Sequence, residues 1–250
     1  MSPDWMWLNS SGANIGIENS LISSIKGTLD DRSGHGLDHV LRVRTLALLF
    51  ADSEGADPDI VELASLLHDV DDYKLVGTNK SQELNNAKRF LENAGIGSKT
   101  YETILQIIRT IGFSKRLEGA RPSTIEGMVV SDADMCDAIG AEGILRVHKY
   151  GISRQIPFFN KLLVPEVNNL SADGYRNNPS KHSVQHFFDK LLRVPSMMLT
   201  ETGRAEAKRR QTIMIDFLKE LFREESSKDW SEFLASYLKN DPKVLPNVAL

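Results

Sequence analysis

The stretch LDHVLRVRTLALLFADSEGADPDIVELASLLHD (residues 37–69) predicts two consecutive helices and, with them, the fold class. Apolar residues recur at helical spacing through its first half, and Gly55 ends that run. Asp57 followed by Pro58 has the form of a helix N-cap with a first-turn proline, so a second helix is expected to run to about His68. This stretch is therefore helical on both sides of one short turn.

The same helical signals continue along the rest of the chain. Asn79 with Gln82, and Ser123 with Glu126, resemble capping boxes that open helices. Strand alternation and hairpin signals are almost absent. We therefore expect an all-α fold, with further helices near 79–94, 98–111, 123–134, 182–193, 201–224 and 228–239.

The expected organisation is a single all-α domain over residues 1–240. Its core extends from about 30 to 150, its C-terminal helices occupy 182–240, and residues 241–250 form a tail. Residues 151–181 contain three prolines and show little periodicity. A segment of that length in a compact helical protein predicts a flap-like loop beside a binding site.

The composition limits the partners and the compartment. With 34 acidic and 30 basic residues the formal net charge is -4, which argues against the broad basic face that duplex nucleic acid requires. The single cysteine, Cys136, excludes an intrachain disulfide and fits a reducing compartment. The N-terminal sequence MSPDWMWLNS has no signal-peptide pattern, and no run approaches the roughly 20 apolar residues of a membrane helix. We expect a cytoplasmic protein with no membrane partner; a homo-oligomer stays open.

Three groups of polar residues interrupt otherwise apolar helices: HGLDHVLRV (35–43), LLHDVDDYK (66–74) and SDADMCDAIGAEGI (131–144). In the first, His39 points along a core-facing stripe. In the second, the pair His68-Asp69 is costly to bury unless both groups have partners, and both can reach one ion only from a helix end or a bent turn.

The third group holds three acids on or near one helical face. Asp132, Asp134 and Asp137 lie among small apolar residues, where they would repel one another and raise their pKa values unless a cation lay among them. Each group alone also has a structural interpretation: a core histidine with one hydrogen bond, a helix-end pair, or N-caps and surface acids. Together they give the order His…His-Asp…Asp on separate predicted helices.

That order resembles the HD-domain metal-dependent phosphohydrolase superfamily, and most closely its small stand-alone members. The similarity lies in the His-x-x-x-His-x-x-Arg-Val start, in the Asp-Ala-Asp-x-x-Asp-Ala-Ile-Gly-Ala stretch and in HSVQHFFDKLL (182–192), and it extends from about residue 30 to 224. The resemblance implies an HD-type helical bundle with one metal ion between its helices. It implies four ligands: His39, His68, Asp69 and Asp134.

The sequence alone leaves some ligand and substrate positions open. Asp137 lies one turn beyond Asp134 and is the alternative last ligand, although the spacing within Asp-Ala-Asp favours Asp134. His35 resembles a phosphate contact more than a ligand. The resemblance also places an acid for general acid/base work at Asp72. The candidate phosphate contacts are Arg42, Lys74 and Lys190.

Two histidines and two carboxylates form a mixed nitrogen and oxygen set that favours a six-coordinate divalent ion over structural Zn²⁺. Mn²⁺ is favoured, and Fe²⁺, Co²⁺ and Mg²⁺ are alternatives. HD proteins with two metals carry extra histidines between the His-Asp pair and the last aspartate. This chain has no histidine between positions 69 and 147, so we expect one ion.

The substrate is a nucleotide by resemblance, and the favoured reaction converts a nucleoside or deoxynucleoside triphosphate to monophosphate and pyrophosphate. A 5'-nucleotidase or another nucleotide phosphomonoesterase or phosphodiesterase is the first alternative. The second is a regulatory module that binds metal and nucleotide without turnover, against which the intact ligand set argues.

Overall fold

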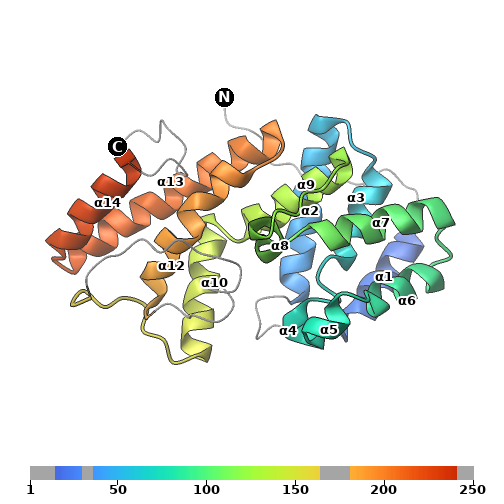
Figure 1. Cartoon of the computed structure of the whole chain (residues 1–250), viewed down its shortest axis with the longest axis horizontal. Coiled ribbons are helices and arrows are strands. Elements are labelled where there is room, and N and C mark those ends of the chain that lie inside the picture. Colours follow the sequence, from blue (N-terminus) through green and yellow to red (C-terminus); the bar gives the residue numbers. More distant parts are fainter. Residues whose placement is uncertain (1–14, 30–35, 164–180, 241–250) are drawn as a thin grey trace.

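The computed structural model describes residues 15–29, 36–163 and 181–240, and these residues form helices and irregular connections without a strand. This confirms the all-α prediction (Figure 1). None of the described helices is both long enough and apolar enough to cross a membrane. The helices are α1 (Ile15–Lys26), α2 (Leu37–Glu54), α3 (Pro58–Leu67), α4 (Tyr73–Val76), α5 (Thr78–Ser81), α6 (Asn85–Asn93), α7 (Ser98–Thr110), α8 (Phe113–Leu117), α9 (Ile125–Asp137), α10 (Gly140–Ser153), α12 (Ser183–Asp189), the 3-10 helix η1 (Leu191–Met197), α13 (Glu201–Glu224) and α14 (Lys228–Asn240).

Helices α2, α3 and α9 pack against one another and form the centre of the fold. The predicted turn between α2 and α3 is confirmed. Gly55 adopts a left-handed conformation with φ of 70° and donates its backbone N–H to Ala51, which ends α2. The Asp57 carboxylate accepts hydrogen bonds from the backbone N–H groups at the start of α3. Buried apolar side chains such as Val43 and Leu67 fill the space between these helices.

The single helix expected from Asn79 to Gly95 is wrong, because the chain breaks it into α5 and α6. The break lies at the buried residue Leu84, whose φ is 55°. The N-cap of α6 comes from elsewhere: the Asp71 carboxylate accepts hydrogen bonds from the backbone N–H groups of Asn86 and Ala87. A tertiary cap therefore replaces the local capping box.

The capping box expected at Ser123 and Glu126 is also wrong, by one residue. Thr124 is the N-cap of α9, and its hydroxyl accepts a hydrogen bond from the backbone N–H of Gly127. The Glu126 carboxylate instead accepts a hydrogen bond from the backbone N–H of Asp57, 69 residues away in sequence. The side chain that the local pattern assigns to its own helix therefore joins α9 to the start of α3.

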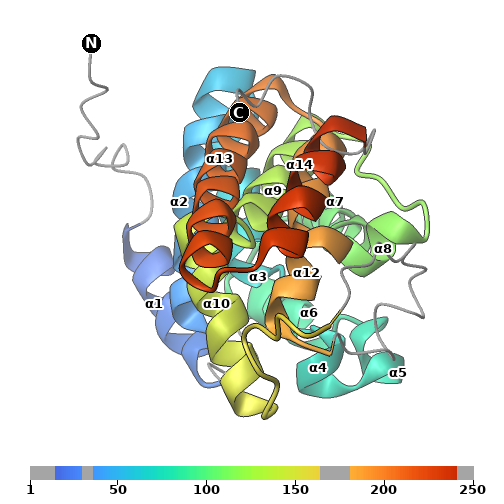
Figure 2. The same ribbon diagram turned by 90° about the vertical axis from the view of Figure 1, so that its left-hand side faces the viewer.

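The C-terminal helices close onto this centre through the long helix α13. It packs against α2, α9, α10 and α14, and Figure 2 shows it beside α2 and α14. The fully buried Asp132 carboxylate fixes the start of α13 by accepting hydrogen bonds from Leu199 N–H, Thr200 N–H and the Thr200 hydroxyl. Gly203 follows there because a Cβ at that position would lie 2.4 Å from Asp132 Oδ2. Asp132 is thus a buried structural acid.

The segment expected as a flap is only partly described. Residues 151–163 complete α10 and continue into the aromatic cluster of the C-terminal helices. There Phe158 makes edge contacts with Phe187, and Phe159 contacts Trp230. Residues 164–180 of the expected flap and the expected tail, 241–250, lie outside the described residues.

Candidate metal centre

His39 lies in the first turn of α2 and is almost fully buried. Its Nδ1 is 2.7 Å from Asp137 Oδ2 on α9. An ionised carboxylate can only accept, so Nδ1 carries a hydrogen, and Nε2 is the nitrogen that can offer a lone pair to an ion. That Nε2 points away from Asp137, toward the end of α3.

His68 lies directly after α3 and is held in the same way. Its Nδ1 is 2.7 Å from the carbonyl oxygen of Ser65, which can only accept, so Nε2 is again the nitrogen that can offer a lone pair to an ion. Residues 68–71 form a turn, in which the backbone N–H of Asp72 donates to Asp69 O. The chain therefore leaves helical geometry at the His68-Asp69 pair, and both side chains reach the same point.

Four side chains from three elements converge there. The Nε2 atoms of His39 and His68 are 3.2 Å apart. Asp69 Oδ2 lies 3.2 and 3.4 Å from these two nitrogens, and Asp134 Oδ1 lies 3.5 and 3.7 Å from them. One ligand atom from each of His39, His68 and Asp134 lies within 4.8 Å of the others.

These separations fit a divalent ion. Donor atoms about 2.0–2.2 Å from one ion lie about 3 Å apart when they subtend a right angle. Two imidazole nitrogens 3.2 Å apart beside two carboxylates favour positive charge between them, either a proton or a metal ion. Burial disfavours the charged form of His39, but hydrogen bonds to Asp134, Asp137 and Asp69 outweigh it and raise its pKa to about 10. The cluster thus favours positive charge where an ion would bind.

Asp137 lies behind His39 rather than among the converging atoms. Its buried carboxylate accepts hydrogen bonds from Arg42 Nε at 2.8 Å, from Arg42 Nη2 at 3.0 Å and from Arg146 Nη1 at 2.9 Å. Burial alone would raise the pKa of Asp137, but the hydrogen bonds from His39 and Arg42 and the charge of Arg146 hold it well below its usual range. This geometry favours Asp134 over Asp137 as the last ligand and makes Asp137 the group that orients His39.

The structure describes the side chains of three of the other predicted residues, Arg42, Asp72 and Lys190. Arg42 directs its guanidinium to Asp137 and Glu142. The Lys190 ammonium lies over the Phe113 ring, 4.5 Å from its centroid. Asp72 is half-buried at the end of the His68 turn. His35 lies outside the described residues, and Lys74 is in α4 but its side chain lies outside the described side chains.

Two basic residues near the site were not predicted from the sequence. Arg146 on α10 reaches Asp137 from a helix that carries no other site residue. Burial lowers the pKa of Lys115 on α8, and the negative charges of Asp72, Asp69 and Asp134 oppose this shift. Nothing local marks either residue, because arginine and lysine are common on helix surfaces and only the tertiary fold brings them here.

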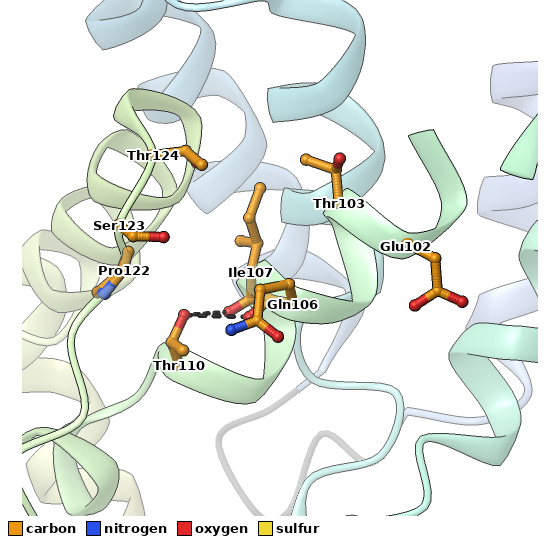
Figure 3. Close-up of a pocket in the computed structure, with 8 residues that line it drawn as sticks. All are labelled: Glu102, Thr103, Gln106, Ile107, Thr110, Pro122, Ser123 and Thr124. Carbon is orange, nitrogen blue, oxygen red and sulfur yellow. Dashed lines mark hydrogen bonds between the residues drawn. The ribbon is translucent and has the colours of Figure 1, made fainter. Parts of the chain in front are cut away.

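A surface pocket lies away from this centre, between α7 and the chain that enters α9 (Figure 3). Most of its lining residues carry a hydroxyl or amide side chain, and the Thr110 hydroxyl donates back to the carbonyl oxygens of Gln106 and Ile107. Its lining contains none of the converging residues. The pocket therefore has no part in the metal centre.

A family model and a relative of known sequence both match this chain. A family model described as HD domain matches residues 36–139. YpgQ of Bacillus subtilis (strain 168) is 35% identical over 194 residues, which cover 77% of this chain and 85% of YpgQ. The region matched by the family model includes His39, His68, Asp69 and Asp134.

Solved structures agree with the sequence comparison. A protein from Lactobacillus plantarum superposes with a TM-score of 0.72 at 29% identity, covering 86% of this chain and 100% of that chain. An HD-superfamily hydrolase from Bacillus thuringiensis gives 0.65 at 27% identity, covering 84% and 97%. The crystal structure of YpgQ in complex with ADP gives 0.64 at 29% identity, covering 83% and 97%.

Proposed function

The chain belongs to the HD-domain superfamily of metal-dependent phosphohydrolases, and from that premise we propose that it hydrolyses a nucleoside or deoxynucleoside triphosphate to monophosphate and pyrophosphate. The observation that carries the proposal is the convergence of the His39 and His68 Nε2 atoms with the Asp69 and Asp134 carboxylates. A nucleotide substrate is supported by YpgQ, a relative at 35% identity whose crystal structure is a complex with ADP.

The ligands of the proposed ion are His39, His68, Asp69 and Asp134. When bound, a divalent ion polarises a phosphoryl oxygen and lowers the pKa of a coordinated water. The mixed nitrogen and oxygen donors favour Mn²⁺, with Fe²⁺, Co²⁺ and Mg²⁺ as alternatives. One ion per chain accords with the four converging side chains.

The chain's own groups would orient the reactants. Asp137 holds the His39 ring with its Nε2 turned toward the site, and Arg42 and Arg146 hold Asp137 in place. Asp72 follows Asp69 by three residues and lies at the end of the same turn. We assign to its carboxylate the role of orienting the attacking water or accepting its proton. Arg42 therefore acts through Asp137, whose carboxylate engages its guanidinium.

A product screen tests this function. Purified protein is incubated with Mn²⁺, Mg²⁺ or Co²⁺ and with nucleoside tri-, di- and monophosphates, and orthophosphate and pyrophosphate are measured separately. We expect pyrophosphate from triphosphates, and no product from the Asp134→Asn variant. Orthophosphate from monophosphates alone would instead identify a 5'-nucleotidase. Nucleotide binding without product from any substrate would contradict hydrolysis and favour a regulatory module.

A further inference from the structure

The arginines beside the metal centre lie on the wrong side of His39 to meet a substrate at the ion. Arg42 and Arg146 both donate to Asp137, which is bonded to Nδ1 of His39. The converging ligand atoms lie at the opposite edge of that ring, around Nε2. A phosphate group at the ion therefore needs a positive charge from another direction.

Lys115 is a further positive charge near the centre, and it makes no printed contact with Asp137. It lies in α8, directly after α7, and its Nζ donates a hydrogen bond of 2.8 Å to the carbonyl oxygen of Ile108 near the end of α7. Helix α7 packs against both α3 and α9, the two elements that deliver His68 and Asp134. Figure 1 shows α8 continuing from α7 toward α9. The half-buried ammonium thus lies close to the ends of the elements that form the centre.

The strongest charges that act on the Lys115 ammonium come from carboxylates in or beside the metal centre. Burial lowers the pKa of Lys115, and the charges that oppose this shift belong, in order of strength, to Asp72, Asp69 and Asp134. These three carboxylates come from the His68 turn and from α9, so the ammonium lies within electrostatic reach of the centre. Glu118, on its own stretch of chain, follows them in strength.

The hydrogen bonds of Lys115 leave room for a ligand. An ammonium has three N–H donors. Within the described part of the chain, Lys115 Nζ donates one hydrogen bond, to Ile108 O, and forms no ion pair with a carboxylate. Capping the last carbonyls of α7 is a structural role that this single bond fulfils. Two donors stay available beside carboxylates whose negative charge an ion would neutralise.

We propose that Lys115 binds a phosphate group of the substrate beside the metal centre, an inference that rests on the proposed nucleotide hydrolysis. A lysine ammonium is a compact point charge that recognises phosphate without reading its substituent. The contact therefore contributes to binding of the polyphosphate tail and not to selection of the base. Inorganic pyrophosphate carries the same chemistry and should bind at the same place.

The first test compares variants of the metal-loaded enzyme. Lys115→Met removes the charge and keeps the length of the stem, Lys115→Arg keeps a charge, and Lys99→Met is the matched control at the exposed start of α7. Because a hydrogen bond to a charged group contributes about 1.5–3 kcal/mol, we expect Lys115→Met to raise KM for the nucleotide and the inhibition constant of pyrophosphate about tenfold or more. Lys115→Arg should recover much of this loss, and Lys99→Met should match wild type.

A further readout separates a substrate contact from a role in the ion site. Co²⁺ titration of the metal-free protein should show no weaker binding in Lys115→Met than in wild type, because Lys115 is not a ligand. If KM and the pyrophosphate inhibition constant of Lys115→Met both lie within twofold of wild type, the inference is wrong. Weaker Co²⁺ binding that accounts for the whole loss would overturn it equally.

A measurement on the wild-type protein covers the case in which Lys115→Met does not fold. Acetylation of each lysine is followed by peptide mass spectrometry with Mn²⁺, with and without inorganic pyrophosphate. We expect pyrophosphate to slow acetylation of Lys115 severalfold and to leave Lys99 unchanged; equal rates at Lys115 would overturn the inference. If no nucleotide is hydrolysed at all, the proposed function fails, and protection by pyrophosphate still decides whether Lys115 binds phosphate.

Discussion

Replacing Asp137 with asparagine tests how the fold prepares His39 for an ion. The carboxylate is 3% exposed and accepts hydrogen bonds from His39, Arg42 and Arg146. Asparagine keeps the shape but has one acceptor oxygen, and its NH₂ group would face a donor already present. Either His39 Nδ1 or an arginine then loses its partner, and the imidazole is no longer fixed with Nε2 toward the site.

The expected magnitude follows from this loss of orientation. Removing a partner that fixes a metal-binding histidine weakens metal affinity about 10–100-fold, or about 1.4–2.8 kcal/mol. Removing a ligand itself should cost more, because the ion loses a bond as well as an orientation. Asp137→Asn should therefore bind Co²⁺ more weakly than wild type and more tightly than Asp134→Asn.

The assay is Co²⁺ titration of metal-free protein followed by visible absorption, with circular dichroism to confirm the helical fold. Glu62→Gln is the matched control, because it makes the same carboxylate-to-amide change in a partly buried residue whose ion pair is with Arg44 and not with a proposed ligand. We expect Glu62→Gln to bind Co²⁺ as wild type does. A folded Asp137→Asn protein with wild-type affinity would refute the orienting role, and an affinity as low as that of Asp134→Asn would make Asp137 a ligand.

Further predictions concern the ion, the bond that breaks and the packing. Elemental analysis of the purified protein should give one divalent metal per chain, and two at full occupancy would contradict a mononuclear centre. His68→Ala and Asp69→Ala should each abolish turnover while circular dichroism shows a folded helical protein, since apolar packing supplies most of the helix stability; near wild-type turnover at limiting metal would remove that residue from the ligand set. Hydrolysis of a triphosphate in ¹⁸O-labelled water should place the label in the monophosphate, because one ion can hold one phosphorus and its attacking water but not two successive phosphates of the tail; label in orthophosphate would mean attack at the terminal phosphorus. Gly203→Ala should lower the thermal midpoint by the equivalent of about 1–3 kcal/mol, because its Cβ would lie 2.4 Å from Asp132 Oδ2; Gly27→Ala, where a Cβ meets nothing within 4 Å, is the control and should melt like wild type.

The helical framework was largely predictable because its signals are local. The Asp57 cap, the Gly55 stop and the apolar periodicity of α2 and α3 all depend on neighbours within one or two turns. The predictions failed where a side chain forms its hydrogen bonds with a distant part of the chain. Asp71 caps α6, and Glu126 bonds to Asp57, and neither partner can be read from the residues around it.

The same distinction between local and tertiary signals applies to the candidate site. The four proposed ligands could be named because the spacing of His39, His68-Asp69 and Asp134 resembles a known family. The choice between Asp134 and Asp137 needed the structure, since the two residues lie one turn apart and only the ring orientation of His39 tells them apart. Arg146 and Lys115 could not be found, because tertiary folding alone brings α10 and α8 to the site.

The three aspartates of α9 restrict where the length of this chain can change over evolutionary time. Within two turns the helix presents Asp132 to the start of α13, Asp134 to the converging ligands and Asp137 to His39. An insertion or deletion of one residue in α9 before Asp132 would rotate all three carboxylates by about 100° relative to the start of the helix. The α13 segment is under the same restriction, because a chain shortened before Thr200 would leave a buried carboxylate without donors. We therefore expect length variation among descendants of this chain to spare α9 and the start of α13.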